Sequence, residues 1–482
     1  MICGCGALAA AGWLGGCASG GRAQPEPGSA PGTPGAAARG ARPQPLPRGV
    51  ISAATLTVFI ESDGRIGASF AGLSYEKAYL AVPCFTPDNE RLLGLFRRLG
   101  PSLLRVGGDS VDRVLWTPGG SGRSRGQVAP ADVEALAGFL DGCAWRVLYG
   151  VNLATSTPAA AADEVAYAVH ALGASLYGIE LGNEPDLYTG GYFAHFTLAD
   201  FEQRWQRFRG AIIARTPGVT FTGPADAGHV SDWTVPFGVH TGGQIALLTQ
   251  HHYRGSGRSP LATITTLLSP DSALADELAV LGQATTRSGV PYRLAETNSF
   301  FGGGAPHVSD RYAAALWVID LLFGIAQAGG AGANLHGGGG GYTPIADSDG
   351  AVIGPRPLYY GMLLFTLAGE GTLRRCSLAT EVTGVSAYAL ERTDGALSVV
   401  VVNKDATHNL SLSIDCGRAV AQASLVALTG PAADALSGVC IQGSEVGADG
   451  AFSPQPPYRL PHSGRLVHCY VAALSAALIR VN

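Results

Sequence analysis

The stretch YGIELGNEPDLY, Tyr177–Tyr188, decides the fold that we predict for this chain. Its first half is apolar and favours a buried strand, but the strand ends in Asn183, Glu184 and Pro185, with Glu180 inside the run. An unpaired buried carboxylate is costly. Another part of the chain must therefore supply a polar partner at the end of this strand.

Short apolar runs alternate with amphipathic stretches on both sides of it, which is typical of repeated strand–helix units. Amphipathic helices are expected, for example, over residues 90–100, 200–216 and 310–327. Eight strands are expected, which is the number in a closed (β/α)8 or TIM barrel. They cover residues 67–76, 103–108, 146–153, 176–184, 220–227, 246–253, 292–298 and 332–340.

The length indicates an α/β protein with more than a barrel, because the 482 residues exceed the roughly 250 of a typical barrel. We expect the barrel over 66–368 and an antiparallel β-sandwich over 369–482, where β-type runs alternate with turn residues. The strand-like run at 50–65 is expected to join the sandwich. With 14% charged residues and a net charge of -5, no basic surface predicts nucleic-acid binding.

Residues 1–49 have a different composition. MICGCGALAAAGWLGGC resembles the apolar core of a secretory signal, although it lacks a basic start. Residues 14–17 resemble a lipoprotein cleavage box, which would place a lipid anchor on Cys17; a fortuitous apolar segment is the alternative. The rest, to residue 49, is rich in Pro, Gly and Ala and predicts a disordered linker. We therefore expect an exported protein that is secreted, periplasmic or an outer-surface lipoprotein.

Two glutamates are the candidate catalytic residues. In a (β/α)8 barrel, functional side chains gather at the carboxyl ends of the strands. Glu184 ends the fourth expected strand and Glu296 the seventh, so their carboxylates should face each other across the barrel mouth. Such a pair is typical of glycosidases, in which one carboxyl group donates a proton and the other is ionised. Asn183 is expected to hydrogen-bond the sugar, and Tyr253 to bind Glu296 and keep it ionised.

A run of five glycines, Gly337–Gly341, ends the eighth expected strand and is followed by Tyr342. Glycines permit a close approach of the backbone, and several N–H groups can then point at one anion, to which Tyr342 adds a hydroxyl. A flexible loop without a ligand is the alternative. A nucleotide-phosphate loop is not predicted, because the Lys-Ser/Thr pair that follows one is missing.

Other candidates carry two interpretations each. Glu76, at the end of the first expected strand, should either bind sugar hydroxyls or form an ion pair with Lys77. His252 should contact the substrate or orient the nucleophile, whereas His251, of opposite parity, is expected in the core. No cluster predicts a metal site and no cofactor is expected. The nine cysteines lack zinc spacing, and a disulfide among the last four is possible.

The chain is similar, over Val50–Asn482, to glycoside hydrolase family 79, the β-glucuronidase and heparanase family of the clan A retaining glycosidases. The motifs that carry the resemblance occur in the family's order, and one position departs from it, since Asp109 stands where Asn is expected; its role stays open. The motifs are FAGLSYEK, LRVGGDS, IELGNEPDLY, QHHY, LAETNSF and HGGGGGY.

The resemblance implies that Glu184 is the acid/base and Glu296 the nucleophile. It also implies that Gly338, Gly339 and Tyr342 receive the carboxylate of a uronic acid. The expected activity is that of a retaining exo-β-glucuronidase, which removes terminal glucuronic acid from glycans or glycoconjugates without a metal.

Three alternatives remain beside this prediction. An endo-acting, heparanase-like enzyme would need clustered cations at the strand ends, where only Lys77, Arg105 and Arg254 are expected. A clan A glycosidase for neutral sugars would have no use for an anion-binding glycine loop. A non-catalytic carbohydrate-binding protein would not need both Glu184 and Glu296.

Overall fold

The structure is a computed structural model that describes residues 42–482. The predicted leader, with Cys17, lies outside the described residues, and so does most of the predicted linker. Within the described range, no helix is both long and apolar enough to cross a membrane.

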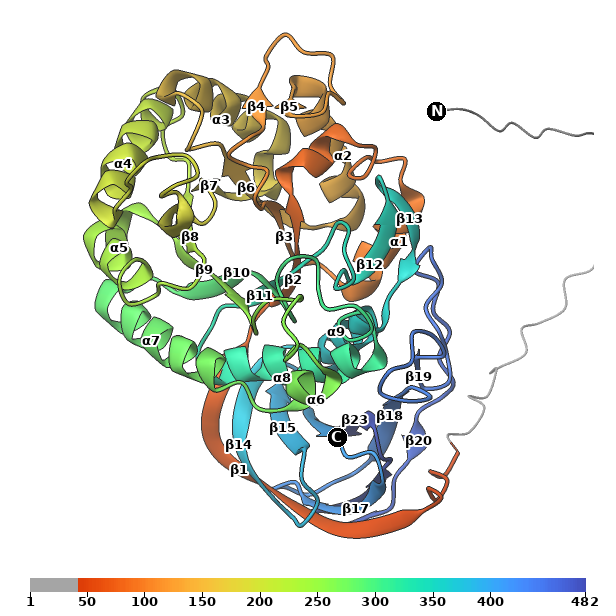
Figure 1. Ribbon diagram of the computed structural model, residues 1–482. Helices are drawn as coiled ribbons and strands as arrows, with labels where there is room; N and C mark the ends of the chain where they lie inside the picture. The colour runs from red at the N-terminus through yellow and green to blue at the C-terminus, as the bar shows by residue number, and fades with distance from the viewer. Residues whose placement is uncertain (1–41) are drawn as a thin grey trace, which may run out of the picture. The chain divides into compact units, whose positions relative to one another are not determined.

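Eight parallel strands close into a barrel, as the sequence predicted (Figure 1). The order around it is β10-β11-β2-β3-β6-β7-β8-β9, and β9 also pairs with β10. These strands are buried on both faces, which explains why they read as continuous apolar runs. They are β2 (Ala71–Glu76), β3 (Leu103–Gly107), β6 (Arg146–Val151), β7 (Leu176–Leu181), β8 (Phe221–Asp226), β9 (Leu247–Tyr253), β10 (Tyr292–Asn298) and β11 (Ala333–His336).

Helices separate the strands and surround the barrel (Figure 1). Two of them, α8 and α9, are buried along almost their whole length, because the barrel covers one side of them and the C-terminal sheet covers another. The helices are α1 (Glu90–Leu99), α2 (Pro130–Cys143), α3 (Pro158–Leu172), α4 (Leu198–Arg215), α5 (Thr234–Thr241), α6 (Ile264–Leu268), α7 (Ser272–Ser288), α8 (Tyr312–Gln327) and α9 (Pro357–Ala368).

The C-terminal part is one curled sheet of eleven strands around its own apolar core. Strand β1 (Val50–Ile66) lies between β14 and β17, so the predicted N-terminal strand does join this part. The β1–β17 pair is parallel and the other pairs are antiparallel. The remaining strands are β14 (Gly371–Thr380), β15 (Val385–Arg392), β16 (Leu397–Asn403), β17 (His408–Asp415), β18 (Ala423–Thr429), β19 (Cys440–Ile441), β20 (Tyr458–Arg459), β21 (His462–Ser463), β22 (Leu466–Val471) and β23 (Ser475–Val481).

Two small ribbons lie in the loops of the barrel. Strand β4 (Leu115–Trp116) pairs with β5 (Gln127–Val128) after β3. Strand β12 (Ile345–Ser348) pairs with β13 (Ala351–Pro355) after the glycine run, so the chain turns back before α9 begins.

Strand β16 shows how the sheet joins the barrel. Val399 and Val401 pack into the core of the sheet, whereas Val400 and Val402 belong to the cluster that contains the barrel helices. Successive strand residues point to opposite faces, so both faces of this strand are buried. At the start of α8, the Tyr312 hydroxyl donates to carbonyls of the sheet at 3.0 and 3.2 Å.

Ordered contacts begin inside the segment that the sequence predicted as linker. The Tyr470 N–H donates to Gln44 Oε1 at 2.9 Å, and Gln44 Nε2 donates to the Tyr470 carbonyl at 2.6 Å. The segment therefore lies along β22 before β1 starts. All four C-terminal cysteines are free thiols, so the possible disulfide is not formed.

Candidate active site

Glu184 lies just beyond β7, in a left-handed turn with φ 48° and ψ 54°. Strand β7 ends at Leu181, so this turn, rather than strand alternation, sets the direction of the side chain. The Glu184 N–H donates to the Ala225 carbonyl at 2.8 Å, which fixes the turn to β8. A Cβ on Gly182 would lie 2.4 Å from the Tyr188 hydroxyl, so only glycine fits there.

The carboxylates of Glu184 and Glu296 face each other at the carboxyl ends of the strands. One oxygen of each and a ring nitrogen of His251 all lie within 4.8 Å of one another. The side chains are 21% and 9% exposed, so both acids reach solvent. The Tyr253 hydroxyl donates to Glu296 Oε1 at 2.7 Å, which confirms the predicted contact.

Arg105, on β3, is the centre of the site, and the sequence had suggested only a cation at the rim. Its side chain is fully buried and donates to Glu180 at 2.5 Å, to Glu296 Oε2 at 2.7 Å and to Asn183 Oδ1 at 2.9 Å. Arg105 is therefore the polar partner of the buried Glu180 carboxylate. Burial lowers the pKa of Arg105, but the two carboxylates outweigh it and raise this pKa.

The same charges act on the nucleophile candidate. Burial raises the pKa of Glu296, but the cationic groups of His336, His251 and Arg105 outweigh burial, and Tyr253 adds a hydrogen bond. The pKa of Glu296 is therefore well below its ordinary value. Glu296 is held as a carboxylate, which a nucleophile has to be.

The two histidines of β9 differ from the sequence prediction: His251, rather than His252, contacts a glutamate of the site. His251 is fully buried, and its Nδ1 lies 2.9 Å from Glu184 Oε1. His252 points out of the barrel, where it lies 2.7 Å from Glu277 and 3.2 Å from Asp271. The prediction for His252 was wrong because residues two apart share a face, and Tyr253 already points inward.

Asn183 is buried, and its side chain hydrogen-bonds two other residues of the site. Its side-chain oxygen accepts from Arg105, and its Nδ2 donates to Asp109 Oδ1 at 3.4 Å. Its backbone N–H donates to the buried Asp112 at 3.0 Å. Burial and then the charges of the neighbouring carboxylates, Glu184 first, raise the pKa of Asp109 to about 6.

Glu76 ends β2 and does not pair with Lys77, because Lys77 is buried against Glu164 and donates to the Gly150 carbonyl. The Glu76 carboxylate accepts the N–H groups of Asp109 and Ser110 at 3.2 and 2.7 Å. It remains 26% exposed, so it keeps a face toward the barrel mouth.

His336, at the end of β11, was missed by the sequence analysis. Its Nδ1 lies 3.4 Å from Glu296 Oε2, and its Nε2 lies 3.7 Å from Glu76. This histidine connects the two carboxylates. The signal was its place at a strand end, immediately before the glycine run.

The glycine run is held by its own hydrogen bonds. Gly337 N–H donates to the Ser74 carbonyl at 2.7 Å and Gly341 N–H to the Gly303 carbonyl at 2.6 Å. Gly338 and Gly339 have φ values of 77° and 93°, which favour glycine. A nest formed here can use at most the N–H groups of Gly339 and Gly340, because the Gly338 N–H donates to Thr343 Oγ1 at 3.3 Å. Tyr342, 8% exposed, lies with its ring 6.3 Å from the Tyr253 ring and 5.9 Å from the His336 ring.

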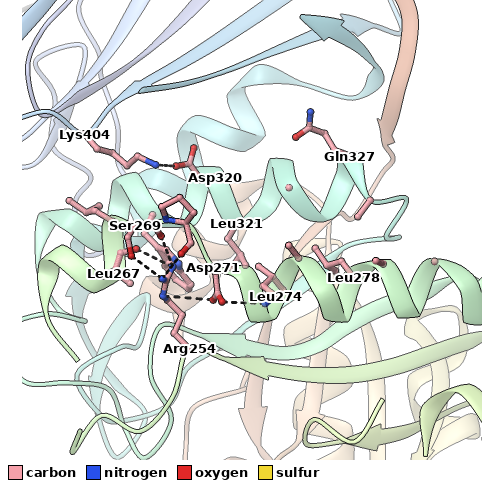
Figure 2. A pocket seen from close by; sticks show the side chains of 18 residues that line it. Arg254, Leu267, Ser269, Asp271, Leu274, Leu278, Asp320, Leu321, Gln327 and Lys404 are labelled. Carbon is pink, nitrogen blue, oxygen red and sulfur yellow. Dashed lines mark hydrogen bonds and ion pairs between the residues drawn. The ribbon is translucent and has the colours of Figure 1, made fainter. Parts of the chain in front are cut away.

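Arg254, the third cation that was expected at the strand ends, also contacts groups of the protein. It donates to the Ser269 carbonyl at 2.9 Å and lies 3.7 Å from Asp271. Figure 2 shows it at one end of a cavity of about 550 Å³ outside the barrel, with the ion pair of Lys404 and Asp320 near the other end. Five leucines are among the residues that line this cavity, and neither Glu184 nor Glu296 does so.

Glu184, His251 and Glu296 are also a set of atoms that could hold a metal ion, which the sequence did not predict. Each atom already has a partner: His251 binds Glu184, and Arg105 binds Glu296. The guanidinium supplies a positive charge 2.7 Å from Glu296 Oε2, where a bound cation would be repelled.

No family model matches the chain. A protein named beta-glucuronidase from Aspergillus niger is 26% identical over 291 residues, and one of the same name from Neurospora crassa is 24% identical over 351 residues. The chain covers 54% and 62% of the length of these curated relatives, and the matches cover 54% and 60% of the chain.

Solved structures support the fold over almost the whole chain. A 4-O-alpha-L-rhamnosyl-beta-D-glucuronidase from Fusarium oxysporum superposes with a TM-score of 0.74 at 19% identity, over 88% of this chain and 99% of that one. The GH51 arabinofuranosidase from Xanthomonas axonopodis gives 0.65 at 14% identity, over 89% and 100%. Both likenesses show the fold alone.

Proposed function

We propose that this protein is a retaining β-glucuronidase that acts on terminal glucuronic acid. The observation that carries the proposal is the facing pair of Glu184 and Glu296, whose nearest oxygens lie within 4.8 Å. Retaining glycosidases have carboxyl groups about 5 to 5.5 Å apart, and inverting ones about 6.5 to 9.5 Å. The narrow separation favours double displacement, because it is below the spacing at which inverting enzymes place their water.

The two glutamates have different tasks in that reaction. Glu296, ionised beside Arg105 and Tyr253, attacks the anomeric carbon, and the bond to the aglycone oxygen breaks. Glu184 gives its proton to that oxygen, then takes one from the water that hydrolyses the glycosyl-enzyme ester. His251 orients the Glu184 carboxyl group through its 2.9 Å contact.

The substrate class rests on three weaker supports. The two curated relatives are named beta-glucuronidase. The segment of Gly338, Gly339 and Tyr342 lies beside His336, with backbone angles suited to an anion nest. Lys77, Arg105 and Arg254 are each bound to groups of the protein, which favours exo action over the binding of long sulfated chains.

The experiment is a comparison of chromogenic β-glucuronide, β-glucoside and β-xyloside under identical conditions. We expect turnover of the glucuronide alone, and background rates in Glu296→Ala. Glu90→Ala is the matched control, because Glu90 is 75% exposed on α1 and should leave the rate unchanged. Equal turnover of the glucoside would replace the proposal by a neutral-sugar glycosidase, and no turnover at all would support a binding protein.

The stereochemistry has its own test. A proton NMR time course should show the β-anomer of glucuronic acid before the α-anomer. Glu184→Ala should be slow, and azide should partly restore its rate by attacking the glycosyl-enzyme without a base. An α-anomer that appears first would make the enzyme inverting.

Export, with a lipid on Cys17, is a separate proposal that rests on residues 14–17 alone. Mass spectrometry of the N-terminal peptide from the membrane fraction tests it, with Cys17→Ser as the control. An unmodified N-terminus in the cytosolic fraction would contradict it.

A further inference from the structure

The opposite end of the barrel holds a second feature, at the amino ends of the strands. A cavity of about 520 Å³ is lined there by residues that begin strands or directly precede them. Arg146 begins β6, Leu247 begins β9, and Arg293 is the second residue of β10. The cavity therefore lies at the other end of the strands from Glu184 and Glu296.

Arg293 is a buried charge without a counter-charge. Arg293 is 3% exposed. Its guanidinium donates to Asn334 Oδ1 and, at 3.0 to 3.2 Å, to the carbonyls of Phe70, Ala331 and Ala333. In the described part of the chain, no carboxylate lies within 4.0 Å of it. A buried guanidinium that binds only neutral oxygens is electrostatically costly.

The backbone leaves room for this guanidinium. A Cβ on Gly332 would lie 2.2 Å from Arg293 Nη1, and a Cβ on Gly72 would lie 2.9 Å from Nη2. A Cβ on Gly332 would also lie 2.4 Å from the Phe70 carbonyl oxygen, and a Cβ on Gly72 would lie 2.2 Å from that of Leu103, so both positions need glycine. The guanidinium therefore packs directly against the backbone at both glycines.

Two further arginines line the same cavity. Arg146 lies over the Tyr177 ring, 4.9 Å from its centroid, and donates to the Leu176 carbonyl at 3.2 Å. Arg65, at the end of β1, is exposed. Within residues 42–482, neither forms an ion pair, and no aspartate or glutamate lines the cavity. Three guanidinium groups therefore contribute positive potential to one enclosed space.

Two acidic residues near the cavity are not among the residues that line it. Asp63 accepts a hydrogen bond from Gln327 at 2.6 Å, at the end of α8. Glu370 lines a neighbouring cavity together with Arg392. Neither supplies the missing negative charge inside the space that Arg65, Arg146 and Arg293 share.

We propose that this cavity binds a small organic phosphate or sulfate ester, with its oxyanion between the three arginines. Arg65 and Arg146 would supply guanidinium donors, which match a tetrahedral oxyanion. Arg293 would contribute mainly its charge, because its Nε, Nη1 and Nη2 already donate to protein oxygens. The volume of about 520 Å³ far exceeds the roughly 30 Å³ of one water and falls in the range of small-molecule sites. Phe70 and Tyr177 offer surfaces for an apolar or aromatic body.

Calorimetric titration of the full chain tests this proposal. The probes are inorganic phosphate, inorganic sulfate, phenyl phosphate and phenyl sulfate, each at equal ionic strength adjusted with NaCl. We expect one site per chain and at least a tenfold higher affinity for a phenyl ester than for the inorganic ion. The double variant Arg65→Gln/Arg146→Gln should weaken ester binding at least tenfold.

The variants are chosen so that folding does not confuse the result. Arg65 and Arg146 are exposed, so their loss should leave the thermal melting curve of the unliganded protein unchanged. Arg97→Gln is the matched control, since Arg97 is 48% exposed on α1, away from the cavity. Glu296→Gln should keep full affinity for the ester, which separates this cavity from the proposed sugar site.

Four results would overturn the proposal. One is binding that the double variant leaves unchanged. Another is binding that Glu296→Gln removes, because the ester would then occupy the barrel mouth. The third is no heat beyond that of NaCl with any of the four probes. Equal affinity for inorganic phosphate and phenyl phosphate would overturn the proposal of an ester ligand, because the inorganic ion alone would then account for the binding.

Discussion

The two ends of the barrel each contain a buried arginine, and the two arginines lie in opposite surroundings. Arg105, at the carboxyl end, donates to the carboxylates of Glu180 and Glu296. Arg293, at the amino end, donates only to carbonyl and amide oxygens. The pKa of Arg105 is raised by its two partners, whereas burial lowers the pKa of Arg293.

This difference separates a completed network from an open one. At the carboxyl end, the charges of the protein neutralise one another, and the guanidinium holds a carboxylate ionised for chemistry. At the amino end, one charge is left over, and a ligand from outside could neutralise it. Under the two proposals, the same side chain in the same barrel serves either catalysis or binding, depending on whether the chain supplies its anion.

The largest expected effect comes from breaking the completed network. Arg105→Met leaves Glu180 buried without a counter-charge, so the free energy of unfolding should fall by about 3 to 5 kcal/mol. Activity should fall to background, because Glu296 loses the guanidinium that donates to its Oε2 and that is one of the groups lowering its pKa. Urea denaturation and the glucuronide assay measure the two effects.

Arg293→Met provides the matched comparison at the other end. It removes a charge that was already uncompensated, so we expect a smaller loss of stability than for Arg105→Met. Arg97→Met, which disrupts an exposed pair with Glu90 and an exposed hydrogen bond to the Gly142 carbonyl, should change stability by less than about 1 kcal/mol. If Arg293→Met lost as much stability as Arg105→Met, the two ends of the barrel would not differ in how their buried arginines contribute to stability.

The barrel was predictable because its strands are buried on both faces and alternate with helices of regular period. The strand-end rule then found Glu184, Glu296 and Tyr253, because it needs only the position at which each strand stops. The curled sheet was predicted less completely. Its parallel β1–β17 pair joins segments more than 350 residues apart, and no local pattern in β1 specifies that register.

The groups that surround the two glutamates were harder to predict, because they depend on which way each side chain points. Arg105 lies inside an apolar strand, as Glu180 does on β7, and two opposite charges in buried strands do predict an ion pair. This signal was available, but it was overlooked in favour of a position at the rim. For His251 and His252, the inward direction of Tyr253 would have settled the choice.

An intermediate effect is expected from Tyr253→Phe, which removes one hydrogen bond from the carboxyl-end network. A hydrogen bond to a charged group contributes about 1.5 to 3 kcal/mol, so kcat/KM should fall about 10- to 100-fold. The hydroxyl is one of the groups that lower the pKa of Glu296. Without it that pKa rises, and the acid limb of the pH–rate profile should move to higher pH. An unchanged acid limb would separate Tyr253 from the ionisation of Glu296.

The smallest effect should come from Asp109→Asn, which removes a negative charge from the carboxyl end. The pKa of Asp109 is raised from 3.8 to about 6, so the folded state binds this proton more tightly than the unfolded state. The wild-type protein therefore loses stability as the pH rises from about 4 to about 6. The variant lacks this loss, so its Tm should equal that of the wild type near pH 4 and exceed it by about 1 to 3 °C at pH 7.

Thermal melts from pH 4 to pH 7 measure that difference, and Arg146→Gln at the amino end is the control. A guanidinium stays charged throughout this range, so the Tm difference between Arg146→Gln and the wild type should not change with pH. A pH-independent difference for Asp109→Asn as well would show that Asp109 is already ionised in the folded protein at pH 4. The negative charge of Asp109 would then not destabilise the carboxyl end.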